Sequence, residues 1–146
     1  MSAPRHVPSA GMSTRTKARK AALDVLYEAE MRGEPPAEAL RRRVEAAEPP
    51  VREYTVTLVE GYAADAEQID HLLATYSEGW NLSRMPAVDR NLLRVAVYEL
   101  CHEPAVDTPV AISEAVELAT SLSTDESPKF VNGLLAKIAD VVRPTT

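Results

Sequence analysis

Apolar residues recur at intervals of three and four positions along most of the chain, and this spacing constrains the fold more than any other feature of the sequence. One such stripe consists of Val88, Leu92, Val95, Ala96 and Leu100. Residues with this spacing lie on one face of an α-helix. No segment shows the sustained alternation of apolar and polar residues that is typical of a half-buried strand. The sequence therefore predicts an all-α fold.

Prolines, glycines and capping residues divide the chain into about seven predicted helices. The first helix is expected to begin at Ser13 or Thr14, either of which can cap it, and to end at Gly33. Residues 51–76 form either two helices or one bent helix, because Gly61 lowers the helix propensity within the segment. The other predicted helices cover roughly residues 37–47, the segment after Pro86, and residues 110–122 and 127–142.

The domain organisation predicted from the sequence is simple. Residues 1–12 contain prolines, serines and a glycine without an apolar period, which indicates a disordered leader. Residues 13–146 are expected to form a single helical domain whose core suffices for folding without a disulfide or a metal. Cys101 is the one cysteine and is interpreted as a small core residue. With no apolar run of about 20 residues and no secretory signal, the protein is expected to be cytoplasmic.

Charge is distributed unevenly between the start of the chain and the rest. The net charge is -6, but five of the 16 basic side chains lie in residues 1–20, where no acid occurs, so the remaining chain carries -11. A cationic end on an acidic body is typical of a localised phosphate-binding patch, since Lys and Arg bind polyanions by releasing their counterions. A disordered basic tail is the alternative interpretation.

Motifs for catalysis or metal binding are missing from the sequence. It contains no glycine-rich phosphate loop, no CxxC and no paired histidine motif. By spacing, Glu99, His102 and Glu103 share a helical face, as do Glu67 and His71, but solvated charge is the favoured interpretation of both groups. No catalytic residue, metal or cofactor is therefore predicted.

Several segments resemble the motifs of a known protein family. The stretch VDRNLLRVAVYEL, residues 88–100, is similar to the VDRNILRLAXYEL pattern of NusB proteins. Residues 109–138 resemble that family's VAINEAVELAK followed by SXKFVNGVLDKI. KARKAALDVLYEAE is similar to the family's RXXARXXALQXLY opening, and EGYAADAEQID resembles its LVXGVXXXXXXID segment. The resemblance covers about residues 13–142.

The resemblance implies both a fold and a function. The fold is two packed, roughly perpendicular helical bundles. NusB-like proteins of bacteria pair with ribosomal protein S10, and the heterodimer binds the boxA element of nascent RNA in the RNA polymerase antitermination complex, notably during ribosomal RNA transcription. Members of the family occur as monomers and as dimers, so the resemblance leaves open whether this protein is a monomer or a homodimer. The implied protein is an RNA-binding transcription antitermination factor and not an enzyme.

Basic residues of the first helix are the main candidates for RNA binding. Arg15, Lys17, Arg19 and Lys20 can line its first turns with groups that reach phosphates. Because the row of Arg15 and Arg19 continues to an apolar residue, Leu23, the helix is expected to pass from solvent or RNA into the core between Arg19 and Leu23.

Further RNA contacts are expected away from the first helix. In the resemblance, the family's second RNA-contacting segment corresponds to residues 124–129, which include Glu126 and Lys129. Binding of single-stranded RNA also needs stacking surfaces, and Tyr76 and Trp80 are the aromatic candidates, although both also suit packing.

The S10-facing positions of the family correspond to Tyr27 and Asp89. Asp89 has an alternative explanation, because a carboxylate near a helix N-terminus interacts favourably with the helix dipole. For Asn91, Glu114 and Asn132, internal hydrogen bonding is a structural alternative to a functional role.

Two other functions compete with antitermination. NusB-like domains also form the N-terminal part of some ribosomal RNA methyltransferases, but a methyltransferase requires a cofactor domain for which 146 residues leave no room. A helical adaptor that binds S10 or itself without RNA is the second alternative, because the basic stretch is sparser than the family's arginine cluster.

Overall fold

The computed structural model describes residues 13–46, 50–78 and 81–144, and within them it confirms the all-α prediction. Seven α-helices and one 3-10 turn, η2, make up the regular structure of this part of the chain. The predicted leader 1–12 and Trp80 lie outside the described residues. The helices are α1 Thr14–Arg32, α2 Pro36–Ala46, α3 Glu53–Ala64, α4 Ala66–Tyr76, α5 Ala87–His102, α6 Thr108–Leu122 and α7 Ser127–Val142, with η2 at Leu82–Arg84.

Helix α1 begins and ends at the predicted capping residues. The Ser13 hydroxyl accepts a hydrogen bond of 3.0 Å from the backbone N–H of Thr16, which satisfies one of the free amide groups of the first turn. At the other end, Gly33 has a φ of 65°, a left-handed conformation that a residue without a Cβ adopts without strain. The two caps fix the length of α1, and with it the reach of the basic residues at its start.

Residues 51–76 form two helices, but the break does not occur at the glycine. Helix α3 ends at Asp65, whose N–H donates to the Tyr62 carbonyl at 3.0 Å. Gly61 lies inside α3, where a Cβ would meet the Cε1 atom of Tyr98 at 2.2 Å. Gly61 therefore lets an aromatic ring of α5 pack directly against the backbone of α3.

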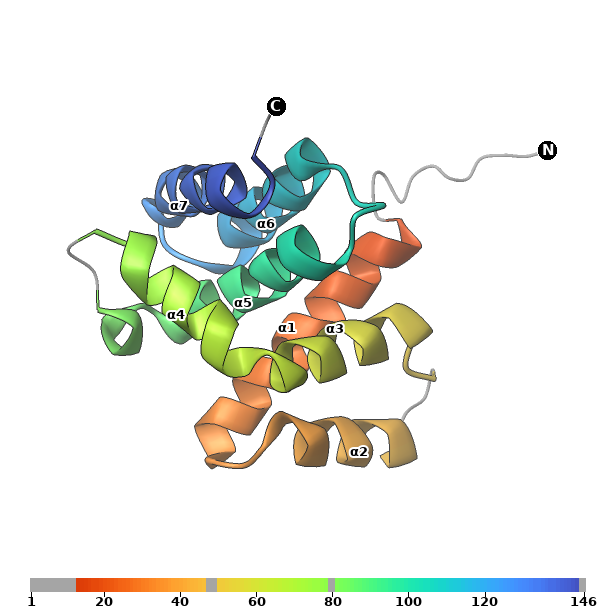
Figure 1. Ribbon diagram of the computed structural model, residues 1–146. Coiled ribbons are helices and arrows are strands. Elements are labelled where there is room, and N and C mark those ends of the chain that lie inside the picture. The colour runs from red at the N-terminus through yellow and green to blue at the C-terminus, as the bar shows by residue number, and fades with distance from the viewer. Residues whose placement is uncertain (1–12, 47–49, 79–80, 145–146) are drawn as a thin grey trace.

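The helices form two groups that share α5 (Figure 1). In the first group, α1, α2 and α3 pack against one another, and in the second, α6 and α7 pack against each other and α5, with α4 against α5 and α7. Helix α5 also contacts α1 and α3, and ten of its residues from Asp89 to Leu100 are buried. Helix α5 is thus the central helix of the described part of the chain. Within the described part of the chain, no helix has the length and apolar character needed to cross a membrane.

Candidate nucleic-acid and partner interface

The start of α1 presents basic side chains to solvent. Arg15 and Lys17 are exposed, and no acidic residue occurs in the first turn. The Lys20 ammonium is partly exposed and forms an ion pair of 2.9 Å with Asp24, one turn further along the helix. Arg15 and Lys17 are therefore the predicted RNA contacts that the structure leaves most available to a phosphate.

The structure corrects the prediction that Arg19 is available to RNA beside Arg15. The Arg19 side chain is buried, and its Nε donates hydrogen bonds of 3.0 Å to both carboxylate oxygens of Glu99. Its Nη1 donates to Glu114 Oε1 at 3.2 Å. Burial alone would lower the pKa of Arg19, but the hydrogen bond to Glu99 and the charge of Glu99 outweigh it and raise the pKa. Because Ala18 is also buried, α1 enters the core one turn earlier than predicted, and Arg19 is a structural residue.

Tyr54, which sequence reasoning did not identify, lies between the exposed and the buried arginine. Its hydroxyl donates to Glu99 Oε2 at 2.5 Å. The guanidinium carbon of Arg15 lies 4.0 Å from the ring centroid, and that of Arg19 lies 5.9 Å from it. Burial, followed by the hydrogen bond to Glu99, raises the pKa of Tyr54 well above its usual range, so the hydroxyl keeps its proton.

The other predicted RNA residues meet at a second place, around the end of α4 and the start of α7. Tyr76, Glu126 and Lys129 line a cavity of about 1050 Å³, together with Asp89 of α5. Glu126 and Lys129 are exposed, and Tyr76 is half-buried. The structure therefore brings three predicted RNA residues and one predicted S10 residue to the same cavity.

Asp89, the second predicted S10 contact, is buried at the start of α5. Its side chain is 3% exposed, and its Oδ2 accepts a hydrogen bond of 2.7 Å from the Ser127 hydroxyl. Its Oδ1 is buried and has no hydrogen-bond partner among the described residues. Asp89 thus joins the start of α5 to the start of α7, and its contact with S10 stays a prediction.

The two predicted RNA-binding places are far apart. Glu114, which contacts the start of α1, is near the beginning of α6, whereas Glu126 follows the end of α6. From Glu114 to Leu122 alone, α6 rises about 12 Å. Figure 1 accordingly shows the start of α1 and the start of α7 on opposite sides of the molecule. One RNA would have to cross this distance to contact both places.

Tyr27, the other predicted S10 contact, is at the surface. Its side chain is 39% exposed, and Met31, one turn further along α1, is 55% exposed. Most other large apolar side chains of the described chain are buried or half-buried. The pair forms a small apolar surface at the end of α1 away from the basic residues.

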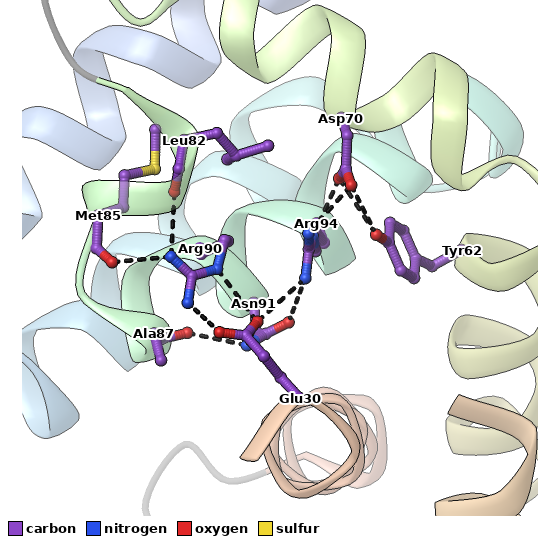
Figure 2. A network of polar contacts seen from close by, with 9 residues as sticks. All are labelled: Glu30, Tyr62, Asp70, Leu82, Met85, Ala87, Arg90, Asn91 and Arg94. Carbon is purple, nitrogen blue, oxygen red and sulfur yellow. Dashed lines mark hydrogen bonds and ion pairs between the residues drawn. The ribbon is translucent and has the colours of Figure 1, made fainter. Parts of the chain in front are cut away.

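A network of polar contacts centred on Glu30 joins α1 to α5 (Figure 2). Glu30 accepts hydrogen bonds from Arg90 Nε at 3.0 Å, Asn91 Nδ2 at 3.1 Å and Arg94 Nη1 at 3.3 Å. The hydrogen bond from Arg90 is the main cause that holds the pKa of Glu30 below its ordinary value. Asn91 is fully buried, which agrees with its interpretation as an internal hydrogen-bonding group.

The same network continues from Arg94 to α4 and α3. Arg94 donates to the two carboxylate oxygens of Asp70 at 2.9 and 3.0 Å, and the Tyr62 hydroxyl donates to the same carboxylate at 3.0 and 3.1 Å. Figure 2 shows Tyr62 and Arg94 converging on Asp70. Four helices are thus tied together by side chains whose charges balance.

A cavity of about 710 Å³ lies beside this network, and Arg90 and Arg94 line it. Arg90 also donates through Nη1 to the carbonyl oxygens of Leu82 and Met85, at 3.0 and 2.9 Å. Because these contacts occupy most of the N–H groups of Arg90, little donor capacity is left for an anion. We therefore assign the network to folding.

The residues weighed as metal ligands have separate roles. Glu99 binds Arg19 and Tyr54, Glu103 accepts a hydrogen bond from the Tyr98 hydroxyl at 2.9 Å, and His102 Nε2 lies 2.8 Å from Asp65 Oδ2. Among the described residues, no group of three or more His, Cys, Asp or Glu side chains is arranged to hold a metal ion. Asn132 is exposed, so it is not an internal hydrogen-bonding group.

Comparison with known proteins extends the resemblance to most of the chain. The chain is 58% identical over 132 residues to the transcription antitermination protein NusB of Salinispora tropica, covering 88% of this chain and 97% of the relative. It is 55% identical over 130 residues to the NusB protein of Kineococcus radiotolerans, covering 89% and 96%.

Solved structures agree with this result. The chain is similar to NusB of T. maritima with a TM-score of 0.81 and 35% identity, covering 90% of this chain and 94% of that one. It is also similar to a chain in a crystal structure of the antitermination factors NusB and NusE with double-stranded RNA, with a TM-score of 0.75, 30% identity and coverage of 87% and 96%. The NusB family model matches residues 16–140, and the chain therefore belongs to the NusB family of transcription antitermination proteins.

Proposed function

We propose that this protein binds single-stranded boxA RNA together with ribosomal protein S10, and that it acts by binding and not by catalysis, in the cytoplasm. The observation that carries the RNA-binding part is the exposed cationic start of α1, in a chain whose charge is otherwise acidic. A homologous fold occurs in a complex of NusB and NusE with double-stranded RNA, and NusE is ribosomal protein S10. The family therefore offers a structural precedent for contact with S10 and with RNA.

In this proposal the two RNA-binding places contribute differently. Arg15, Lys17 and Lys20 supply positive charge to the phosphate backbone. The cavity that contains Tyr76, Glu126 and Lys129 carries more acid than base among its lining residues. Acidic groups repel phosphates but accept hydrogen bonds from base edges. The cavity therefore suits an unpaired base, whereas the start of α1 suits the backbone.

For S10 we propose the surface of Tyr27 and Met31 as the contact. Exposed aromatic and methionine side chains are enriched at protein interfaces, because they bury a large apolar area with few polar groups. Glu30, which precedes Met31 in the sequence, holds this part of α1 against α5, so the surface has a fixed position. Rigid support of this kind lowers the ordering that binding requires.

The test is a salt titration of binding to a boxA oligonucleotide, with and without S10. For contacts to single-stranded RNA, the logarithm of affinity falls with the logarithm of salt concentration by about 0.7 per phosphate. The Arg15→Ala/Lys17→Ala variant is therefore expected to bind more weakly and to reduce this slope by roughly 1.4. The matched control is Arg32→Ala/Arg41→Ala, which removes two exposed arginines at a distance from the start of α1.

The alternative function predicts a different result from the same titration. An adaptor would bind S10 but no RNA at any salt concentration, and the two double variants would not differ. That outcome would overturn RNA binding and keep the S10 surface. If the control variant reduces the salt dependence of binding as much as Arg15→Ala/Lys17→Ala does, positive charge promotes binding without a defined RNA site.

A further inference from the structure

We propose that Tyr54 is a positioning residue, which holds the Arg15 guanidinium flat at the surface so that an unpaired RNA base can stack on it. This inference rests on the proposed RNA binding and names the kind of contact made at the start of α1. It adds a composite surface of an arginine and a tyrosine to the aromatic candidates Tyr76 and Trp80.

The first observation is the position of Arg15. Its guanidinium carbon lies 4.0 Å from the centre of the Tyr54 ring, while the residue as a whole is exposed. A cation over an aromatic ring is attracted by the negative face of the ring. One side of the guanidinium therefore packs on Tyr54, and the side away from the ring faces outward. Single-stranded bases stack on aromatic rings and on guanidinium planes of this kind.

The second observation is the support of the tyrosine itself. The Tyr54 hydroxyl donates to Glu99 Oε2 at 2.5 Å, and Glu99 is 1% exposed. Glu99 in turn receives two hydrogen bonds from Arg19, which is also buried. The ring is thus tied at its hydroxyl to a buried carboxylate that Arg19 also holds. A line of contacts runs from the buried Arg19 through Glu99 and Tyr54 to the exposed Arg15.

This arrangement changes what Arg15 can do. A free arginine on a helix surface samples many rotamers and must lose that freedom on binding. Arg15 is already placed, so less ordering is needed when RNA arrives. Because the elevated pKa of Tyr54 keeps its hydroxyl protonated, the anchor persists at neutral pH. Lys17 has no such support among the described contacts, and its role remains that of a charge.

The experiment uses the full chain and boxA oligonucleotides that carry the fluorescent base 2-aminopurine at successive positions. Stacking quenches this base, whereas a contact to phosphate does not. For the wild-type protein we expect quenching at one or two positions. Arg15→Lys keeps the charge and loses the planar group, so it is expected to retain the salt dependence, to lose the quenching, and to bind about fivefold or more weakly.

Variants of Tyr54 test whether it acts through Arg15. Tyr54→Leu removes the ring and is expected to lose the same quenching, while Tyr54→Phe keeps the ring and loses only the anchor, giving a smaller loss. Both substitutions remove the same stacking contact. The double variant Arg15→Lys/Tyr54→Leu is therefore expected to bind RNA no more weakly than the single variant with the lower affinity. Arg32→Lys, at the far end of α1, is the control and should leave quenching unchanged.

The possible outcomes separate the two proposals. If wild-type RNA binding is intact but Arg15→Lys and Tyr54→Leu keep both affinity and quenching, the stacking inference is overturned alone. Additive losses in the double variant would also overturn it, because Tyr54 would then act independently of Arg15. If the wild-type protein binds no RNA at any salt concentration, the proposed function falls and the inference with it. Arg15→Lys changes an exposed side chain and should not disturb folding, so it tests the stacking inference even if Tyr54→Leu unfolds the protein.

Discussion

The Nε atom of Arg19 donates hydrogen bonds of 3.0 Å to both carboxylate oxygens of Glu99, although 80 positions separate the two residues in the sequence. The pair connects α1 to α5 in the interior, and Glu114 on α6 adds a second carboxylate at 3.2 Å. Buried charges persist only where such partners compensate them. This contact decides both the position of α1 and the loss of Arg19 as a group available to RNA.

Removal of one partner from this pair is expected to destabilise the protein strongly. Glu99→Ala leaves the Arg19 guanidinium buried with one remaining carboxylate, and breaking a buried pair in this way costs about 3–5 kcal/mol of unfolding free energy. Urea denaturation measures the change. Asp24→Ala is the control, because it breaks the exposed Lys20–Asp24 pair, which contributes less than about 1 kcal/mol. Equal effects of the two substitutions would contradict the structural role of Glu99.

Two glycines within helices are expected to respond in opposite directions to the same substitution. Replacing a helical glycine with alanine normally stabilises a protein by about 0.5–1 kcal/mol. This gain is expected for Gly133→Ala in α7, where the new Cβ would have no atom within 4 Å apart from its chain neighbours and the backbone of its own helix. In Gly61→Ala the Cβ would meet the Tyr98 ring, so we expect destabilisation by about 1–3 kcal/mol. Thermal or urea unfolding of both variants checks the sign, and stabilisation by Gly61→Ala would disprove the close packing.

These examples show which parts of the structure the sequence could predict. Helix ends follow from local chemistry, so Ser13 and Gly33 marked the bounds of α1 correctly. Gly61 wrongly suggested a break within the helix, because helix propensity considers only local sequence. The glycine is needed instead for close packing against the ring of Tyr98, which is far away in the sequence.

The candidate site was less predictable for the same reason. Helical spacing places Arg15 and Arg19 on one row, but it cannot show that Glu99 lies opposite Arg19 and draws it inside. No sequence signal distinguishes Tyr54 from other half-buried tyrosines, since its role depends on contacts with Arg15 and Glu99 on two other helices. Contacts between helices therefore mark the limit of what periodicity predicts.

Acid is expected to weaken the network around Glu30. The hydrogen bond from Arg90 holds the pKa of Glu30 below its ordinary value of 4.5. A carboxyl group whose pKa is lower in the folded than in the unfolded protein stabilises the fold above the unfolded pKa, and this contribution is lost as the pH falls through the folded pKa. The difference in unfolding free energy between wild type and Glu30→Gln should therefore be complete near neutral pH and should shrink below about pH 4.5.

Urea unfolding of both proteins across this pH range gives the measurement. The control is Glu60→Gln, because Glu60 is exposed in the interior of α3, away from the helix N-terminus, and has no ion pair among the described contacts. It removes one exposed carboxylate and leaves the Glu30 network intact. A difference between wild type and Glu30→Gln that grows on acidification would have the wrong sign and would exclude the stabilising role of the Glu30 carboxylate.

The apolar surface on α1 is expected to determine affinity for S10, and its contribution to folding is expected to be modest. Tyr27 and Met31 are 39% and 55% exposed, so Tyr27→Ser/Met31→Ser removes partly buried apolar area and is expected to lower the unfolding free energy by about 1–2 kcal/mol, which leaves the protein folded. Loss of two central apolar contacts should weaken S10 binding by about tenfold or more, as measured by calorimetry. Val44→Ser, at a residue 51% exposed on α2, is the control. If the double variant binds S10 with unchanged affinity, S10 contacts a different part of the protein. If Val44→Ser weakens S10 binding equally, the effect reflects a general loss of apolar surface.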